Sequence, residues 1–180
     1  MRELGIYISA SAEMDPECEL LGQMLAKLTR SIRWNIKRTP ASHQQQDPYW
    51  TALEHAVAHI LLVGRDITAP IRVEYRVARE HGVPTYAYRS AAFTPSPALA
   101  AFVRQTDADW HTYDDPQELA AEVRRRIARQ LIEGTPGYGL SLEEIESLAA
   151  ELKEQDTAEQ SSEERRGAGR GGVILPDGRG

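Results

Sequence analysis

Residues 59–88 have the sequence HILLVGRDITAPIRVEYRVAREHGVPTYAY, and this stretch predicts a strand, a helix and a second strand in succession. The segment from Ile60 to Val63 is apolar at every position, which is typical of a central strand covered on both faces. Thr68 is placed to cap a helix that ends at Gly82, and residues 83–88 predict the next strand. A strand, a helix and a strand in this order predict a parallel sheet with the helix packed on one face.

The predicted helix carries one charged residue on its apolar side. Its apolar stripe consists of Ile71, Tyr75 and Ala78, and at about 100° per residue Glu74 falls inside this stripe. The other charged residues of the helix fall outside it. A carboxylate that faces a sheet near the N-terminus of its helix must either bond to a partner or act in a cleft. Glu74 is therefore the first candidate for a functional residue.

Composition limits the class of protein. The chain has 180 residues, of which 41% are hydrophobic and 27% charged, and this fits one domain with its own core and some additional chain. A net charge of -6 argues against a general nucleic-acid binder. The single cysteine, Cys18, excludes an intrachain disulfide and suits a reducing compartment, and no apolar run reaches membrane-spanning length. We expect a cytoplasmic protein.

Strands and helices alternate along most of the chain. Besides the central strand, apolar or alternating segments predict strands at residues 4–9, 32–36, 83–88 and 110–113. The segment 32–36 alternates apolar and polar residues, which indicates a half-buried strand at a sheet edge. We therefore expect residues 1–134 to form an α/β domain with a flavodoxin-like five-stranded parallel sheet, in the order 2-1-3-4-5 with helices on both faces. Such sheets bind ligands at the carboxyl ends of strands 1 and 3, which here lead into residues 9–13 and 64–68.

Four segments of this domain resemble the TIR-like superfamily. They are residues 6–11, 60–64, 71–78 and 82–84, and the resemblance extends from about Leu4 to Glu133. The superfamily includes TIR domains, nucleoside 2-deoxyribosyltransferases and bacterial TIR-like domains of unknown function that are often fused to signalling NTPases. In its enzymatic members a glutamate on the helix after the third strand is the catalytic carboxylate, and Glu74 matches that position. The uncharacterised subgroup favours a pair of serines at a strand end, which Ser9 and Ser11 resemble.

The resemblance implies a nucleotide-binding domain that cleaves the N-glycosidic bond of NAD, a nucleoside or a nucleotide in bacterial signalling or defence. This bond breaks through an oxocarbenium-like state, which the Glu74 carboxylate would stabilise or trap covalently. Polar groups at the strand ends would hold the ribose hydroxyls and the phosphate. The candidates for these contacts are Ser9, Ser11, Arg65, Asp66 and Thr68. We expect no cofactor and no metal, because the histidines do not form a metal-ligand spacing with the cysteine.

Structural explanations of the same residues stay open at this point. Glu74 would be a structural carboxylate if it bonded to loop amides or paired with Arg72 or Arg65. The serines would then be ordinary strand-end caps, and Asp66 a turn residue. The chain also departs from NAD-cleaving TIR domains, because residues 67–71 offer a single threonine where those domains usually have a small polar or aromatic cluster. The alternative function is a non-catalytic TIR-like module that recruits or senses through protein contacts.

The chain changes character after the α/β domain. Residues 135–152 predict a linker and an amphipathic helix, with a capping box at the start of the helix 141–152. Residues 153–180 are rich in Glu, Gln, Ser, Arg and Gly and predict a disordered tail. The apolar stripe of the helix suits docking onto the α/β domain or onto a partner helix. A short apolar patch at 173–176 is a second expected contact with a protein partner, and a homo-oligomer is compatible with both.

Overall fold

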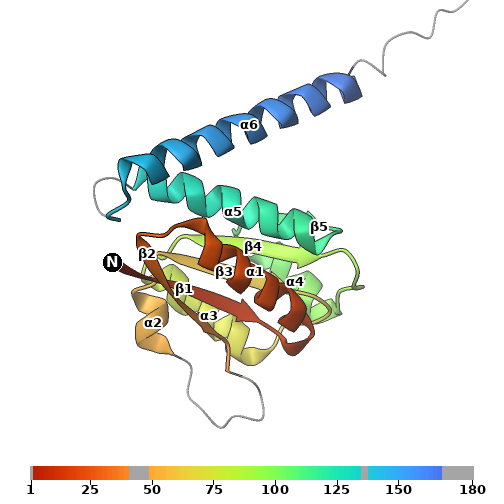
Figure 1. Cartoon of the computed structure of the whole chain (residues 1–180). Helices are drawn as coiled ribbons and strands as arrows, with labels where there is room; N and C mark the ends of the chain where they lie inside the picture. The colour runs from red at the N-terminus through yellow and green to blue at the C-terminus, as the bar shows by residue number, and fades with distance from the viewer. Residues whose placement is uncertain (1, 41–48, 135–137, 168–180) are drawn as a thin grey trace, which may run out of the picture.

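A five-stranded parallel sheet forms the centre of the molecule (Figure 1). The computed structural model describes residues 2–40, 49–134 and 138–167. The strands are β1 (Arg2–Ala10), β2 (Ile32–Arg38), β3 (Ala58–Val63), β4 (Thr85–Ser90) and β5 (Trp110–Tyr113). The helices are η1 (Ala12–Met14), α1 (Asp15–Leu28), α2 (Trp50–Glu54), α3 (Ala69–Glu80), α4 (Pro97–Gln105), α5 (Pro116–Glu133) and α6 (Leu142–Gly167).

The strand order is β2-β1-β3-β4-β5, and every neighbouring pair is parallel. The order predicted from the sequence is therefore confirmed. All six residues of β3 are buried, because β3 pairs with β1 on one side and with β4 on the other and helices cover both of its faces. β2 pairs only with β1 and is partly exposed, which confirms the half-buried strand at the edge.

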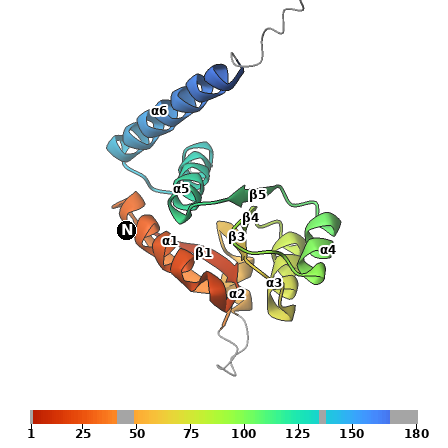
Figure 2. The same cartoon turned by 90° about the vertical axis from the view of Figure 1, so that its right-hand side faces the viewer.

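Helices cover the two faces of the sheet in separate layers (Figure 2). One core lies under α1 and α5 and includes Ile8, Ile60 and Leu62. The cores under α2, α3 and α4 include Tyr7 and Leu61. Successive side chains of a strand point to opposite faces, so Ser9 lies on the same face of the sheet as Tyr7. The layer that holds α3 is therefore the one that receives the polar side chains of β1.

The C-terminal helix α6 packs on α5 (Figure 1). Its buried contact is Leu148, which is 3% exposed and joins the core under α1 and α5. Arg124 of α5 forms an ion pair with Glu151 of α6 beside this contact. The amphipathic helix therefore docks onto the α/β domain, which is one of the two uses that its apolar stripe predicts.

The first turn of α6 is fastened to the loop between α1 and β2. The Glu144 carboxylate accepts hydrogen bonds from the backbone N–H groups of Arg30 (2.7 Å) and Ser31 (2.9 Å). It also accepts one from the N–H of Ser141 (3.0 Å), while the Glu144 N–H donates to the Ser141 hydroxyl (3.2 Å). This reciprocal pair is the predicted capping box, and the same carboxylate ties the helix to the domain.

α6 is longer than the sequence predicts. The pattern predicts a helix that ends at residue 152 and disorder from residue 153, whereas α6 continues to Gly167. No glycine or proline lies between 153 and 166, and most side chains there have good helix propensity, so the helix continues without an apolar face to bury. Figure 1 shows that this second half extends beyond the α/β domain. The apolar patch at 173–176 lies outside the described residues.

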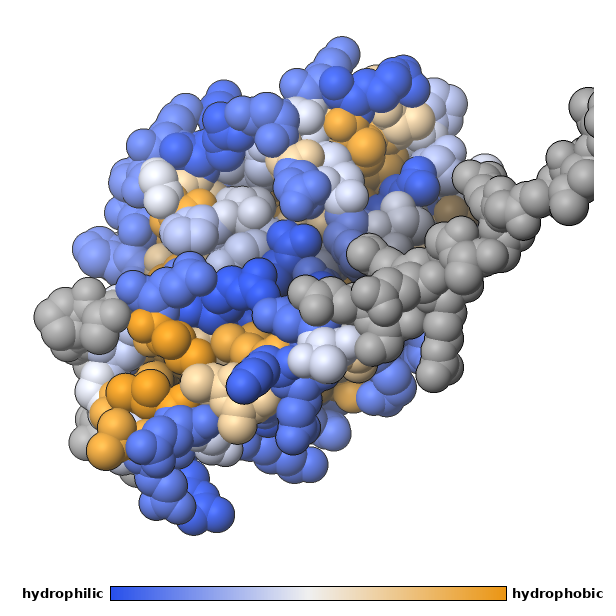
Figure 3. Space-filling view, turned by 90° about the horizontal axis from the view of Figure 1, so that it is seen from above, coloured by the Kyte–Doolittle hydropathy of each residue, from blue (hydrophilic) through white to orange (hydrophobic). Residues whose placement is uncertain are grey.

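Most of the surface on the side seen in Figure 3 is hydrophilic, and hydrophobic side chains appear there in patches. A shallow groove between α1 and α5 is lined in part by Leu20, Met24, Ala120 and Ala121.

Within the described ranges, no helix combines the length and the apolar character that a membrane crossing requires.

Candidate functional site

Glu74 faces the sheet from the middle of α3. Its side chain is 0% exposed and lies among the buried residues Ile71, Tyr75 and Ala78 of the same helix. The prediction that Glu74 falls inside the apolar stripe is thus confirmed. The helix begins after the N-cap Thr68, with a proline in its first turn, and this start fixes which residues face inward.

Three hydroxyl groups hold the Glu74 carboxylate. Tyr7 donates to Oε1 (2.7 Å), and Ser9 (2.7 Å) and Thr39 (2.6 Å) both donate to Oε2. Tyr7 and Ser9 come from β1, and Thr39 is the first residue after β2. The N–H of Ala10 donates to the Thr39 hydroxyl (3.2 Å) and orients it toward the carboxylate. The partners are therefore strand hydroxyls, and not the loop amides or arginines that a structural role predicts.

The hydrogen-bond partners of the Glu74 carboxylate in the described part of the chain are uncharged. Among the described residues, no arginine, lysine or histidine forms an ion pair with this carboxylate. Burial raises the pKa of Glu74, and the hydroxyls of Thr39, Tyr7 and Ser9 offset only part of that rise. A buried anion without a counterion lowers stability, so this arrangement is unusual for a residue with a purely structural role.

A buried histidine extends this group of side chains. His59 on β3 is 0% exposed, and its Nε2 lies 2.8 Å from the Ser9 Oγ. Its Nδ1 lies 3.1 Å from the Oγ1 of Thr85, at the start of β4. Burial lowers the pKa of His59 to about 3, so the imidazole is neutral at neutral pH. We call Glu74, Tyr7, Ser9, Thr39, His59 and Thr85 the Glu74 cluster.

The sequence alone predicts only part of the Glu74 cluster. It singles out Glu74 and Ser9, and the structure places their side chains in direct contact. It gives no role to Tyr7, Thr39 or His59. The signal for Tyr7 is its spacing of two from Ser9, which puts both on one face of β1. His59 pairs with Tyr7 across the sheet, and this register becomes visible only in the folded structure.

The other predicted ligand contacts lie at the ends of β1 and β3. Ser11 is buried and precedes η1 without a side-chain capping bond. Arg65 is exposed and places its guanidinium over the ring of Phe93 (5.9 Å). Asp66 accepts hydrogen bonds from the N–H of Ile67 and from the Ser96 hydroxyl, an arrangement typical of a turn residue.

Thr68 is the N-cap of α3, and its side chain makes no capping bond. Thr68, Arg65 and Asp66 all lie on the surface of the loop that follows β3. Among the described residues, none of the three bonds to the Glu74 cluster. The predicted site is therefore divided into a buried part around Glu74 and an exposed part on this loop.

The loops after β1 and β3 are packed tightly against each other. A Cβ atom on Gly64 would come within 2.8 Å of the Met14 Sδ and within 3.0 Å of the Glu13 Cγ. The Glu13 carboxylate also accepts the N–H of Arg65 (3.2 Å). These two loops flank the topological switch point, where ligands of such sheets bind.

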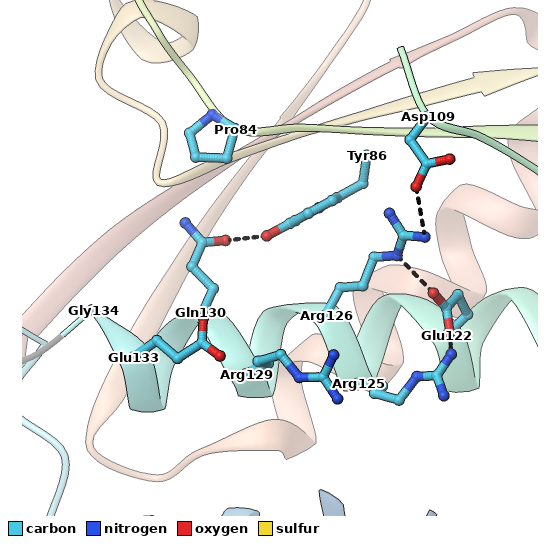
Figure 4. Close-up of a pocket in the computed structure, with 10 residues that line it drawn as sticks. All are labelled: Pro84, Tyr86, Asp109, Glu122, Arg125, Arg126, Arg129, Gln130, Glu133 and Gly134. Atoms are coloured by element: carbon cyan, nitrogen blue, oxygen red, sulfur yellow. Dashed lines mark hydrogen bonds and ion pairs between the residues drawn. The ribbon is translucent and has the colours of Figure 1, made fainter. Parts of the chain in front are cut away.

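A pocket of about 580 Å³ lies on the other face of the sheet, between β4 and α5 (Figure 4). In it the Arg126 guanidinium lies over the ring of Tyr86 (5.6 Å) and pairs with Glu122 (2.6 Å) and Asp109 (3.7 Å). Tyr86 in turn donates to the Oε1 of Gln130 (2.9 Å). Arg126 is thus already paired with two carboxylates of the pocket lining, and Arg125 also pairs with Glu122.

No protein-family model matches the chain, and no curated protein matches its sequence. The class of protein is therefore defined by the fold: an α/β domain with five parallel strands in the order 2-1-3-4-5, compatible with flavodoxin-like and TIR-like folds. In the described part of the chain, no group of three or more His, Cys, Asp or Glu side chains is arranged to hold a metal ion.

Proposed function

We propose that the protein is a TIR-like nucleotide-binding domain that cleaves the N-glycosidic bond of NAD, or of a nucleoside or nucleotide, in bacterial signalling or defence. Glu74 is the catalytic carboxylate in this proposal. The observation that carries it is a fully buried carboxylate that three hydroxyls orient and that no cation among the described residues neutralises. Buried carboxylates whose pKa is shifted by their surroundings are more frequent at functional sites than elsewhere in proteins.

The missing counterion suits the chemistry of glycosidic cleavage. As the bond to the base breaks, positive charge develops on the ribose ring, and this charge can take the place of a cation beside Glu74. The hydroxyls of Tyr7 and Ser9 fix both carboxylate oxygens in advance, so little reorganisation is needed when that charge appears. An arginine in the same place would neutralise the carboxylate before the reaction begins.

Access to Glu74 is most direct from the side of Thr39. Tyr7 and Ser9 are buried, whereas Thr39 is partly exposed and lies just past the carboxyl end of β2. We infer that a ribose hydroxyl of the substrate replaces the Thr39 hydroxyl on Oε2. Ser11 and the exposed side chains of Arg65, Asp66 and Thr68 then supply contacts to the remaining ribose hydroxyl and the phosphate.

Hydrolysis of NAD and of purine nucleosides by the purified protein tests the proposal, with free base and ribose product separated by chromatography. Glu74→Gln keeps the shape of the side chain and removes its charge, so cleavage should fall by at least about 100-fold. Glu80→Gln on the exposed surface of the same helix is the matched control and should keep the wild-type rate. Cleavage retained in Glu74→Gln would end the assignment, whatever the substrate.

The second candidate is a non-catalytic TIR-like module that acts through protein contacts. The observation in its favour is the 0% exposure of Glu74, with hydrogen bonds to both of its oxygens. The half of α6 that extends beyond the domain offers a surface for such contacts (Figure 1). Under this function, the wild type cleaves none of the substrates, in the monomeric or in a concentrated, assembled state, and Glu74→Gln changes only the melting temperature.

A further inference from the structure

The Glu74 cluster forms a continuous path of hydrogen-bonding atoms along the face of the sheet that α3 covers. It runs from Oε2 of Glu74 to the Ser9 Oγ (2.7 Å) and on to Nε2 of His59 (2.8 Å). From Nδ1 of the same ring it continues to the Thr85 Oγ1 (3.1 Å), which lies 3.2 Å from the carbonyl oxygen of Val83. The path thus begins at the carboxyl ends of the strands and finishes at the start of β4.

The Ser9 hydroxyl has one hydrogen and two partners at bonding distance. If Ser9 donates to an ionised Glu74, Nε2 of His59 must carry the hydrogen that bonds to Ser9. Nδ1 then carries no hydrogen and accepts a hydrogen bond from the Thr85 hydroxyl.

If Glu74 is protonated, it donates to Ser9, and Ser9 donates to an Nε2 that carries no hydrogen. Nδ1–H then donates to Thr85, and Thr85 donates to the Val83 carbonyl.

In each of these two arrangements, every donor and acceptor along the path has a hydrogen-bond partner. The two arrangements differ by one proton on Glu74 and by the tautomer of His59, which stays neutral in both. The titratable side chains that face Glu74 among the described residues are Tyr7 from β1 and, through Ser9, His59 from β3. Burial and the neighbouring Glu74 raise the pKa of Tyr7, so Tyr7 remains a donor throughout.

We propose that Ser9 and His59 form a proton wire that joins Glu74 to Thr85 at the opposite end of the sheet. Thr85 passes its hydrogen to Nδ1, Nε2 passes its own to Ser9, and Ser9 passes its own to Glu74. A water molecule then returns a proton to Thr85, which is partly exposed. One proton moves from solvent to Glu74 without a charged imidazole, and the same steps in reverse remove it.

In catalysis, the wire allows Glu74 to exchange a proton while a bound substrate occupies the side of Thr39. His59 is then a positioning residue, because it acts on Glu74 only through Ser9. This use rests on the proposed function, whereas the coupling between Glu74 and His59 is a property of the fold and holds with or without turnover. The test therefore reads the histidine ring itself and needs no substrate.

The experiment follows the ¹⁵N signals of the imidazole nitrogens of the full chain as pH rises, because protonated and bare ring nitrogens are well separated in shift. The His59 signals are assigned with the variant His59→Gln. In the wild type, His59 should carry its hydrogen on Nδ1 at low pH and on Nε2 at high pH, with at least about a 10-fold change in the ratio of the two tautomers across one transition. The exposed His55 and His81 serve as internal controls in the same spectra.

Variants then separate the coupling from an independent titration of His59. In Glu74→Gln the tautomer should stay the same at every pH, because the switching proton is gone. Thr85→Val removes the partner of Nδ1, so Nε2–H should persist to lower pH. One tautomer at all pH values in the wild type, a switch that survives in Glu74→Gln, or protonation of both nitrogens through the transition would each overturn the wire. A tautomer switch in a protein that cleaves no nucleotide would overturn the proposed function alone.

Discussion

Two buried glutamates, one on each face of the sheet, have opposite surroundings. Glu122 on α5 is 8% exposed and pairs with the guanidinium groups of Arg125 and Arg126. Burial alone would raise the pKa of Glu122, but its bonds to Arg126 and Arg125 lower it. Glu74 on α3 is more deeply buried, its partners among the described residues are hydroxyl groups, and its pKa is raised by that burial. The comparison shows two ways of holding a buried carboxylate in one fold, with guanidinium groups at Glu122 and with hydroxyl groups at Glu74.

The largest effect should follow from giving Glu74 the cation that Glu122 already has. In Thr39→Lys the ammonium group can reach the Glu74 carboxylate from the partly exposed side, so cleavage should fall by at least about 100-fold. Steady-state hydrolysis of the best substrate measures this loss. Thr39→Met has a similar length without the charge and should lose less activity. Equal losses in both variants would show that Thr39 matters only for the access of the substrate to Glu74.

The converse change removes the carboxylate from the paired site. Glu122→Gln leaves Arg125 and Arg126 without their shared anion, and it should lower the free energy of unfolding by about 1–2 kcal/mol, a figure reduced because both guanidinium groups are partly exposed. Urea denaturation at neutral pH gives this difference. Nucleotide cleavage should be unchanged, and a loss of activity comparable with that of Glu74→Gln would remove the distinction between the two glutamates.

The pH dependence of stability should have opposite signs at the two sites. The raised pKa of Glu74 makes its contribution most favourable below 4.5, and stability is lost as pH rises through its folded-state pKa. The lowered pKa of Glu122 makes its contribution complete above 4.5, and stability is lost as pH falls through its folded-state pKa. Melting temperatures measured across this range should therefore depend less on pH above 4.5 in Glu74→Gln, and less below it in Glu122→Gln.

The smallest effect concerns a third glutamate, at the start of α6. Burial opposes ionisation of Glu144, but hydrogen bonds, led by that of Ser31, lower its pKa to about 2. Glu144→Ala removes the capping box and the bonds to the α1–β2 loop, which should cost about 0.5–1 kcal/mol. Amide exchange should then increase at Arg30, Ser31 and the first turn of α6. Unchanged exchange there would mean that the contacts of α6 with α5, including Leu148 and the Arg124–Glu151 ion pair, hold the helix in place.

The strand order could be predicted from the sequence because burial leaves a direct pattern. β3 is apolar throughout and β2 alternates, and these two patterns assign the centre and the edge of the sheet. Glu74 could be found because a charge inside an apolar stripe is visible in one helix. The end of α6 could not be found, because a polar segment with good helix propensity resembles a disordered one when it has no face to bury.

The partners of Glu74 could not be predicted for a different reason. Tyr7, Thr39 and His59 come from three different strands or strand ends, and each is unremarkable within its own segment. Their meeting depends on the register of β1 against β2 and β3, and no local pattern determines that register. The loop residues Arg65 and Asp66 were easier to single out, yet their contacts go to Phe93 and Ser96 rather than to the buried part of the site.

The close fit around Gly64 makes the two sides of the proposed site unequal, because it affects only the loops after β1 and β3. The loops after β1 and β3 leave almost no room for a methyl group between Gly64, Met14 and Glu13, so they form a rigid side of the proposed site. In the proposed function, the substrate therefore approaches Glu74 from the side of Thr39, whose partly exposed hydroxyl bonds to the carboxylate. The space beside Thr39, rather than the space beside Gly64, would then set the size of the substrate that Glu74 accepts.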